Sequence, residues 1–262
     1  MTKPVRLDLE LVRRGLVRSR AEATRAIHAG KVVVRGMPAT RATTLVGPEV
    51  PISLMAPASP FVSRGGEKLD CALSRFRVDV ASRRWLDVGA STGGFTDRLL
   101  KGGAEAVAAL DVGYGQLDWR LRTDDRVTVI ERVNARFLTA DDLPWIPHGV
   151  TADVSFISLT LILPAVTAVA SPDADFLLLV KPQFELDKGQ VPAGGVVRER
   201  DQWLRAVERV VDAAKSVGLG LVDATVAEPA GPAGNREFFV HLRRDAPGNP
   251  EAVPRAVDGA LS

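Results

Sequence analysis

Seven apolar segments in the second part of the chain limit its fold more than any other feature. They cover residues 84–90, 106–113, 127–133, 149–157, 175–184, 220–229 and 236–244. Helical patterns separate several of them, most clearly at residues 201–218. Near-continuous apolar strands that alternate with helices predict a mostly parallel sheet covered on both faces. We therefore expect the α/β class, with a Rossmann-like, mostly parallel seven-stranded sheet.

Polar residues stand at the ends of five successive predicted strands: Asp87, Asp111, Asn134, Asp153 and Lys181. In open parallel sheets, ligands bind outside the carboxyl ends of the strands, where the strand order reverses. Five polar side chains at such positions predict a ligand site at this edge of the sheet.

The basic charge is concentrated at the N-terminus, although the whole chain carries a net charge of only +2. The first 60 residues contain ten Lys and Arg against four Asp and Glu, a net +6, which leaves −4 for the remainder. Such asymmetry favours a polyanion-binding module joined to a different kind of domain. Two short helices and a small β-layer are predicted here, with Arg18, Arg20 and Lys31 on a basic face suited to phosphate oxygens.

Length and composition restrict the class of protein further. With 262 residues, the chain can form one α/β domain and a small accessory module. Cys71 is the only cysteine, which excludes an intramolecular disulfide and a cysteine-based metal cluster, and we expect no metal. The N-terminus lacks the apolar segment of a secretory signal, and the longest apolar runs are too short to span a bilayer. We expect a cytoplasmic protein without a membrane partner.

The glycine-rich turn at residues 87–95 has several candidate functions. The Gly-Lys-Ser/Thr of a phosphate-binding P-loop is absent, and the glycine spacing does not match the dinucleotide fingerprint. The pattern Gly89-x-Ser91-x-Gly93 matches a hydrolase nucleophile elbow, with His241 available as a base. However, this turn follows the first strand of its domain, and no HGGG-type segment supplies an oxyanion donor. A tight turn without any ligand is a further alternative.

A site for S-adenosylmethionine (SAM) fits the same turn better. Glycines allow the backbone to approach the methionine part of SAM without a Cβ in the way. A carboxylate at the end of the second strand can accept hydrogen bonds from both ribose hydroxyls. The predicted cofactor-binding residues are Asp87, Gly89, Ser91, Gly93, Gly94, Phe95, Asp111, Asn134 and Asp153.

The N-terminal segment resembles an S4 domain, the small RNA-binding module of ribosomal and RNA-modifying proteins. The resemblance rests on Arg-Leu-Asp at 6–8, Gly-Leu-x-x-Ser-Arg at 15–20 and Gly-x-Val-x-Val at 30–34. Arg35 departs from the family, which more often has asparagine before the turn glycine. The resemblance implies RNA binding, for which the candidates are Arg6, Arg18, Arg20 and Lys31.

Four charged residues resemble the Lys-Asp-Lys-Glu tetrad of the FtsJ-like ribose 2′-O-methyltransferases. They are Lys68 in SRGGEKL, Asp153 in ADVSFIS, Lys181 in LLVKPQFE and Glu237 in GNREFFV. With the S4-like segment in front, residues 5–245 are similar to the TlyA family of ribosomal RNA (rRNA) cytidine 2′-O-methyltransferases, once called haemolysins. The resemblance implies catalysis by this tetrad, SAM as cofactor and rRNA or ribosomal subunits as partners.

The chemistry of these side chains agrees with that resemblance. A ribose 2′-hydroxyl is a weak nucleophile, and a lysine can act as its base only if part of the amine is neutral. We predict that Lys181 deprotonates or steers the hydroxyl while Lys68 favours the neutral amine, and that Asp153 and Glu237 orient the lysines and balance their charge. Phe156 is a candidate for stacking on the extruded target base, with an ordinary core position as the alternative.

These observations predict four segments. They are an S4-like RNA-binding domain at 1–58, a linker at 59–65, an FtsJ-like methyltransferase domain at 66–245 and a disordered tail at 246–262. We expect a monomer. The alternatives are a non-catalytic RNA-binding scaffold and a membrane-active haemolysin, for which the chain offers no strongly amphipathic segment.

Overall fold

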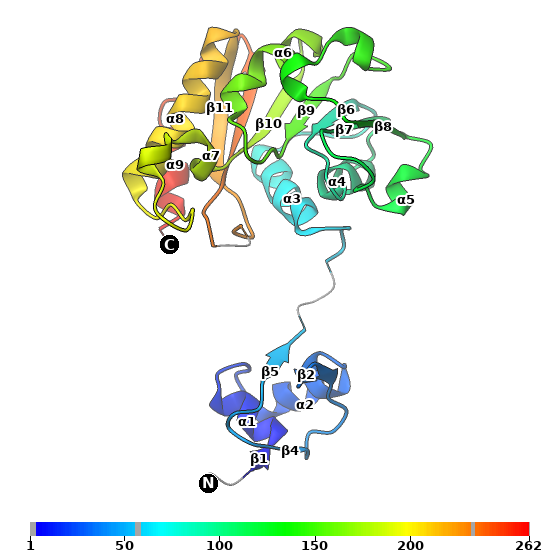
Figure 1. Ribbon diagram of the computed structural model, residues 1–262, viewed down its shortest axis with the longest axis vertical. Helices are drawn as coiled ribbons and strands as arrows, with labels where there is room; N and C mark the ends of the chain where they lie inside the picture. The colour runs from blue at the N-terminus through cyan, green and yellow to red at the C-terminus, as the bar shows by residue number, and fades with distance from the viewer. Residues whose placement is uncertain (1–3, 56–58, 232–233, 262) are drawn as a thin grey trace. The chain divides into compact units, whose positions relative to one another are not determined.

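The computed structural model describes residues 4–55, 59–231 and 234–261. The chain divides into two compact units, Met1–Ala58 and Ser59–Ser262 (Figure 1). Each unit has a hydrophobic core of its own. The division falls at the predicted end of the S4-like segment, but residues 56–58 lie outside the described residues.

The first unit is a small α+β fold. Its helices are α1 (Leu7–Arg13) and α2 (Arg20–His28). Its strands are β1 (Val5–Arg6), β2 (Val32–Val34), β3 (Met37–Pro38), β4 (Leu45–Val46) and β5 (Ile52–Leu54). β1 pairs with β4, and β2 lies between β3 and β5, all antiparallel. The start of α2 follows from its sequence, because the Ser19 hydroxyl accepts a hydrogen bond from the Glu22 N–H at 3.2 Å.

The second unit contains the predicted seven-stranded sheet. Its strands are β6 (Arg84–Val88), β7 (Ala106–Asp111), β8 (Val127–Glu131), β9 (Gly149–Ala152), β10 (Asp175–Val180), β11 (Leu219–Val226) and β12 (Phe238–Arg244). Their order in the sheet is β11-β12-β10-β9-β6-β7-β8, and only the pairings of β12 are antiparallel. The prediction of an α/β class with a mostly parallel seven-stranded sheet is therefore confirmed.

Helices cover both faces of this sheet (Figure 1). They are α3 (Arg64–Phe76), α4 (Gly94–Lys101), α5 (Trp119–Arg122), α6 (Leu163–Val169), α7 (Pro182–Glu185), α8 (Arg200–Ser216) and α9 (Ala252–Gly259). Short 3-10 turns occur at Ala135–Phe137, Ala140–Asp142, Leu159–Leu161 and Lys188–Gln190. One core cluster joins α6, α8 and α9 to the sheet, and the other joins α3 and α4 to the opposite face.

The topology brings residues from distant parts of the chain to one edge of the sheet. The neighbouring strands β7, β6, β9 and β10 are parallel, so their carboxyl ends meet there. β12 runs antiparallel to β10, and Phe238 pairs with Val180. The residue before β12 therefore lies at the same edge as the residues that follow β9 and β10.

The prediction of a disordered tail at 246–262 is wrong for the residues described. Helix α9 packs against β11 and α8, with Val253 and Val257 buried. Arg200 also donates to Asp258 at 2.7 Å. The prolines and glycines of the segment concealed an apolar pair at i, i+4 spacing, which places both valines on one helix face.

The predicted linker at 59–65 also needs correction, because residues 60–65 pack within the second unit. The Val62 N–H donates to Asp97 at 2.9 Å, and Lys101 donates to the Pro60 carbonyl oxygen at 2.5 Å. Helix α3 already begins at Arg64. The proline and glycine of this segment mark the entry to a helix rather than a flexible connection.

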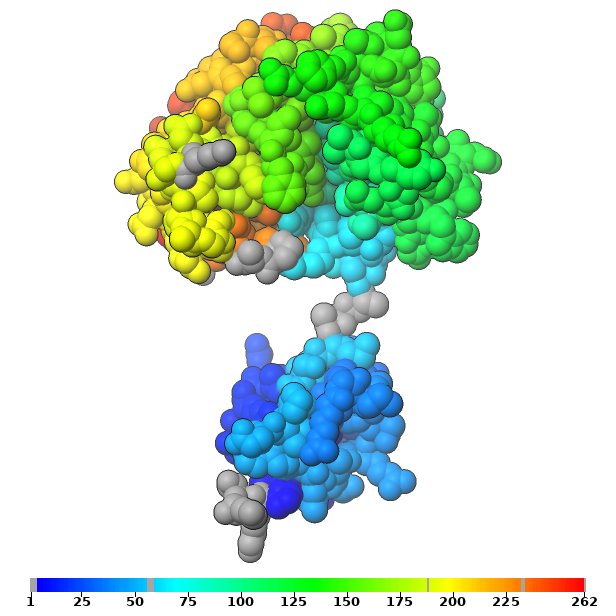
Figure 2. All heavy atoms as spheres, viewed as in Figure 1, coloured from blue at the N-terminus to red at the C-terminus, as the bar shows by residue number. Residues whose placement is uncertain are grey.

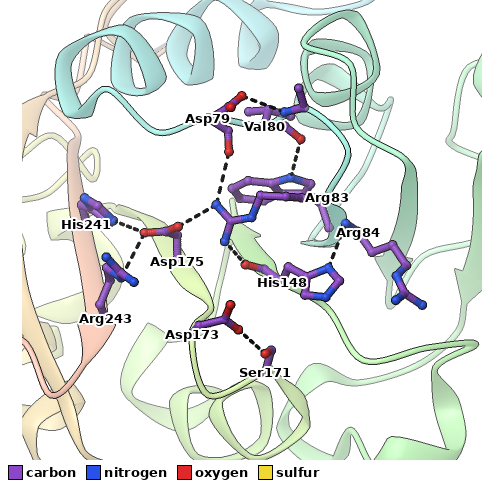
Figure 3. Close-up of polar contacts among 12 residues, drawn as sticks. Asp79, Val80, Arg83, Arg84, His148, Ser171, Asp173, Asp175, His241 and Arg243 are labelled. Atoms are coloured by element: carbon purple, nitrogen blue, oxygen red, sulfur yellow. Dashed lines mark hydrogen bonds and ion pairs between the residues drawn. The ribbon is translucent and has the colours of Figure 1, made fainter.

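A polar network occupies the amino edge of the same sheet (Figure 3). Nε2 of His241 lies 2.7 Å from Asp175, and Arg83 donates to the same carboxylate at 2.7 Å. Burial alone would raise the pKa of Asp175, but the hydrogen bonds from His241 and Arg83 outweigh it, and the pKa lies below its ordinary value. This end of β10 is opposite to the end from which Lys181 extends.

Among the described residues, no helix is both long enough and apolar enough to cross a membrane.

Candidate active site

Two cavities lie at the carboxyl edge of the sheet and meet at the glycine turn. The first has a volume of about 440 Å³ and is lined by α3, the turn and the residues that flank β9, β10 and β12. The second, of about 460 Å³, is lined by residues that follow β6, β7, β8 and β9. Both cavities include Gly89, Ser91, Asp153 and Ser155 in their walls. Groups bound in the two cavities would therefore face each other at these residues.

The turn after β6 requires glycine at its first bend. Gly89 has φ +81°, and a Cβ at this position would stand 2.6 Å from the carbonyl oxygen of Asp153. The Ser91 N–H donates to Asp111 Oδ2 at 2.8 Å, which fixes the turn to the end of β7. The Ser91 hydroxyl lies 3.4 Å from Gln116, whereas His241 is bound at the opposite edge of the sheet. The nucleophile-elbow alternative therefore lacks its base.

Asp111 and Asn134 line the second cavity, as predicted from their positions after strands. Asp111 accepts one backbone N–H on each oxygen, from Ser91 at 2.8 Å and from Gly113 at 2.7 Å. A carboxylate has about four lone-pair positions, so two remain for a ligand. Asn134 accepts from the Arg136 N–H at 3.0 Å, which leaves its amide N–H groups available.

Asp87 does not reach either cavity, contrary to its prediction as a cofactor ligand. It is fully buried, and it accepts hydrogen bonds from the hydroxyls of Thr96 at 2.7 Å and Thr151 at 3.1 Å. Burial raises the pKa of Asp87 to about 7, against the opposing effect of these hydrogen bonds. The residue ties β6 to β9 and to α4 beneath the turn.

The other glycines of the turn have different surroundings. Gly93 lies outside both cavities, contrary to its prediction, because its α-carbon faces the side chains of Leu117 and Leu121 at φ +97°. Gly94 and Phe95 line the first cavity rather than the second. A Cβ at Gly94 would collide with the Ser63 hydroxyl, so this glycine lets α3 and α4 approach each other.

The first pair of the charged tetrad is buried. Lys68, in α3, donates to Glu237 at 2.5 Å, and both side chains are less than 10% exposed. Glu237 directly precedes β12, and Arg64 makes a second contact between the same segments through the Ala230 carbonyl oxygen at 2.6 Å. Figure 2 shows the cyan atoms of α3 beside the orange atoms of this segment at the surface. Packing across the domain thus gives the ammonium a counter-charge.

The second pair lies at the junction of the two cavities. Lys181 follows β10, and its Nζ lies 2.6 Å from Asp153 Oδ1, which follows the neighbouring strand β9. The same ammonium donates to the Ser155 hydroxyl at 2.9 Å. All four members of the predicted tetrad line the first cavity. The structure therefore brings them together as two lysine–carboxylate pairs.

Phe156 is not a core aromatic, because 91% of its surface is exposed. It lines the second cavity, its φ is +65°, and its ring centroid lies 5.3 Å from that of Phe184. A bulky residue in the left-handed region is a backbone outlier and costs free energy. The turn thus holds an exposed aromatic ring beside the site.

Two of the predicted RNA-binding residues of the first unit share one buried carboxylate. Arg6 donates to both oxygens of Asp8, at 3.0 and 2.9 Å, and Arg20 donates to one of them at 3.0 Å. These contacts, led by the Arg6 hydrogen bond, lower the pKa of Asp8 to about 2. Arg18 and Lys31 are exposed, and neither side chain has a partner among the described residues.

Several cavity-lining residues were not predicted. Ser63, Arg64 and Gly65 line the first cavity, Gln116 lines the second, and Ser155 lines both. Ser63, Arg64 and Gly65 belong to the SRGGEKL segment and Ser155 to ADVSFIS, so proximity to Lys68 and Asp153 in sequence was the available signal. Gln116 lies in a loop without a recognisable pattern.

Comparison with known proteins gives matches along nearly the whole chain. A family model for the FtsJ-like methyltransferase matches residues 61–244, and one for the S4 domain matches residues 5–52. The chain is 47% identical to "16S/23S rRNA (cytidine-2'-O)-methyltransferase TlyA" of Mycobacterium tuberculosis, over 98% of each protein. It is 40% identical to "Putative rRNA methyltransferase YqxC" of Bacillus subtilis, over 92% of this chain and 86% of that protein.

A solved structure is similar over the same extent. The "Putative hemolysin from Streptococcus thermophilus" has 36% sequence identity to the chain and a TM-score of 0.75. The match covers 100% of this chain and 98% of that one.

Proposed function

The chain belongs to the TlyA family of FtsJ-like methyltransferases, and on this premise we propose that it methylates the ribose 2′-hydroxyl of cytidine in rRNA with SAM as methyl donor. The observation that carries the proposal is the junction of the two cavities. One cavity contains two lysine–carboxylate pairs, the other contains the ribose-binding candidate Asp111, and Asp153 lines both. This arrangement suits a transfer between two bound molecules.

The residues of the second cavity fit SAM. Gly89 leaves space where a Cβ would meet the backbone, so the methionine part can approach closely. Asp111 retains two lone-pair positions for the ribose hydroxyls, and Asn134 offers amide N–H groups. When bound, SAM supplies a methyl group on a positively charged sulfur.

The residues of the first cavity would position the acceptor. A lysine ammonium has no lone pair to accept a proton, so its ion pair with Asp153 favours steering rather than deprotonation as the role of Lys181. The hydroxyl oxygen would accept a hydrogen bond from Lys181 and take the methyl group while the bond between that carbon and the SAM sulfur breaks. The hydroxyl proton would pass to solvent water, and SAM would leave as the neutral thioether. Positioning of the two reactants would provide most of the acceleration.

The buried pair of Lys68 and Glu237 would form the wall behind this acceptor position. Phe156 is held exposed beside the cavities, where an extruded base could stack on its ring. The arginines around Asp8 in the first unit, with Arg18 and Lys31, would bind RNA phosphates.

Methyl transfer to separated ribosomal subunits tests the proposal. Purified protein is incubated with labelled SAM and either small or large subunits, and the label is mapped as a block to alkaline cleavage of the RNA. We expect 2′-O-methylcytidine, abolished in Lys181→Ala while RNA binding is retained. The exposed Lys215→Ala variant is the matched control. Label on a base or on protein would contradict the proposal. If Lys181→Ala binds RNA and gives the same labelling result as the wild type, a non-catalytic scaffold is favoured.

A further inference from the structure

The ammonium of Lys181 makes one hydrogen bond, to Ser155, and one ion pair, with Asp153. Its Nζ lies 2.6 Å from Asp153 Oδ1 and 2.9 Å from Ser155 Oγ. Within residues 4–55, 59–231 and 234–261, this nitrogen has no other hydrogen-bond partner than Ser155. The hydrogen bond to Ser155 fixes the direction of one N–H, and the adjacent Asp153 carboxylate limits rotation of the ammonium, so the directions of the remaining N–H groups are restricted.

The loop that carries Ser155 is held at both ends. At its start, the Asp153 N–H donates to the Val88 carbonyl oxygen at 2.9 Å. At its end, the Leu159 N–H donates to the carboxylate of Glu185 at 2.8 Å, and the Ser158 hydroxyl donates to the same group at 2.5 Å. Glu185 is 2% exposed, so this anchor is shielded from water.

One short segment, residues 181–185, also contacts this loop near both of its ends. Lys181 is the N-cap residue of α7, and Glu185 is its last residue. Residues 181–185 therefore contact both ends of the loop 153–159, at Asp153 and Ser155 and again at Ser158 and Leu159. Between these contacts, Phe156 has a left-handed backbone conformation, with φ +65°. The position of the Ser155 hydroxyl is thus set by the same segment that carries Lys181.

We propose that Ser155 is a positioning residue, which together with the Asp153 carboxylate orients the Lys181 ammonium so that a remaining N–H is directed at the acceptor hydroxyl. The inference rests on the proposed function, because it assigns the cavity to a ribose. It explains why Ser155 lines both cavities without being needed as a ligand in either. Without the serine, the lysine remains paired with Asp153 but can rotate about that contact.

Steady-state kinetics of Ser155→Ala test the inference. The loss of a hydrogen bond to a charged group predicts a fall in kcat of about tenfold to a hundredfold. The KM values for SAM and for the ribosomal subunit should stay within about twofold of the wild-type values, because Lys181 contacts the reacting hydroxyl and does not contribute to binding. Ser155→Thr keeps the hydroxyl at an exposed position and should restore most of kcat. Ser74→Ala, on the exposed side of α3, is the matched control.

Three results would overturn the inference. The first is a Ser155→Ala variant whose kcat and KM values all equal those of the wild type. The second is a higher KM for SAM or for the subunit at constant kcat, because Ser155 would then be a binding residue. A threonine variant no more active than the alanine variant would exclude the hydroxyl as the cause.

A measurement without turnover separates this inference from the proposed function. The ¹⁵N relaxation of the Lys181 side chain should report a rigid ammonium in the wild-type protein and a mobile one in Ser155→Ala. Rigid behaviour in both would contradict the inference even if methyl transfer is confirmed. If the ammonium is mobile only in Ser155→Ala but the protein methylates no ribose, then Ser155 does hold Lys181 in place and the proposed reaction is wrong.

Discussion

Lys68 and Glu237 form an ion pair with 2.5 Å between Nζ and Oε2, although 169 positions separate them in the chain. Both side chains are less than 10% exposed, so neither charge is compensated by water. The pair joins the first helix of the second unit to the residue that precedes its last strand.

Breaking this pair on one side should destabilise the protein. Glu237→Gln leaves a buried ammonium without a counter-charge, which costs about 3 kcal/mol of unfolding free energy. The double variant Lys68→Met with Glu237→Leu removes both charges and should recover much of that loss in urea denaturation, but no methyl transfer. An equally unstable double variant would show that packing, not charge, dominates at this position.

Removal of the Asp111 carboxylate should weaken SAM binding. Asp111→Ala takes away a charged acceptor, which predicts a loss of about tenfold to a hundredfold in affinity by isothermal titration calorimetry. Asp125→Asn, on the exposed surface after α5, serves as control. If Asp111→Ala binds SAM with wild-type affinity, SAM does not bind in the second cavity as proposed.

The buried carboxyl group of Asp87 should make stability depend on pH. Its pKa is about 7 in the folded protein and near 3.8 in an unfolded chain, so the folded state binds more protons between these values. Unfolding free energy should therefore fall as pH rises from about 4 to 7, with a limiting slope of about 1.4 kcal/mol per pH unit from this group.

Asp87→Asn isolates this effect. The amide cannot ionise but can still accept a hydrogen bond from a threonine hydroxyl. Urea denaturation of both proteins at pH 5 and pH 8 should show the variant gaining stability relative to the wild type at the higher pH. A difference that does not change with pH would mean that Asp87 is not the titrating group.

The arginines that share Asp8 should account for part of the salt dependence of RNA binding. Removing one ion pair between the protein and an RNA phosphate reduces the slope of log affinity against log salt by about 0.7 to 0.9. The double variant Arg6→Ala with Arg20→Ala should therefore bind ribosomal subunits more weakly and with a slope smaller by about 1.5. Arg205→Ala, on the exposed face of α8, should leave the slope unchanged, and an unchanged slope in the double variant would place RNA elsewhere.

The C-terminal helix should contribute to folding rather than to chemistry. Val257 is fully buried, and Val257→Ala should cost about 2 kcal/mol of unfolding free energy. Its kcat at a temperature well below the unfolding transition should equal that of the wild type. The exposed Glu251→Ala is the control, and a stability equal to wild type in Val257→Ala would mean that α9 does not pack as described.

The sheet could be predicted from sequence because each of its strands is a separate apolar run between polar stretches. The charged tetrad could be predicted because its members stand at strand ends or in distinctive short motifs. Asp87 was wrongly assigned as a cofactor ligand because it stands only two residues before Gly89, the first glycine of the turn. Within β6 it pairs in register with Thr151, and side chains alternate between faces, so its carboxyl group lies on the face that α4 covers, against Thr96.

The lysine–carboxylate partners could not be predicted from the sequence order. Lys68, Asp153, Lys181 and Glu237 allow two pairings, and the choice depends on how β12 enters the sheet between β10 and β11. Helix α9 was missed for a related reason, since its apolar pair gains stability only when β11 is present to cover it.

The insertion of β12 between two other strands has a consequence for synthesis. A nascent chain that has emerged only as far as β11 has no strand to separate β10 from β11, and Lys68 has no counter-ion. The tetrad is assembled only when residues 237–244 have left the exit tunnel.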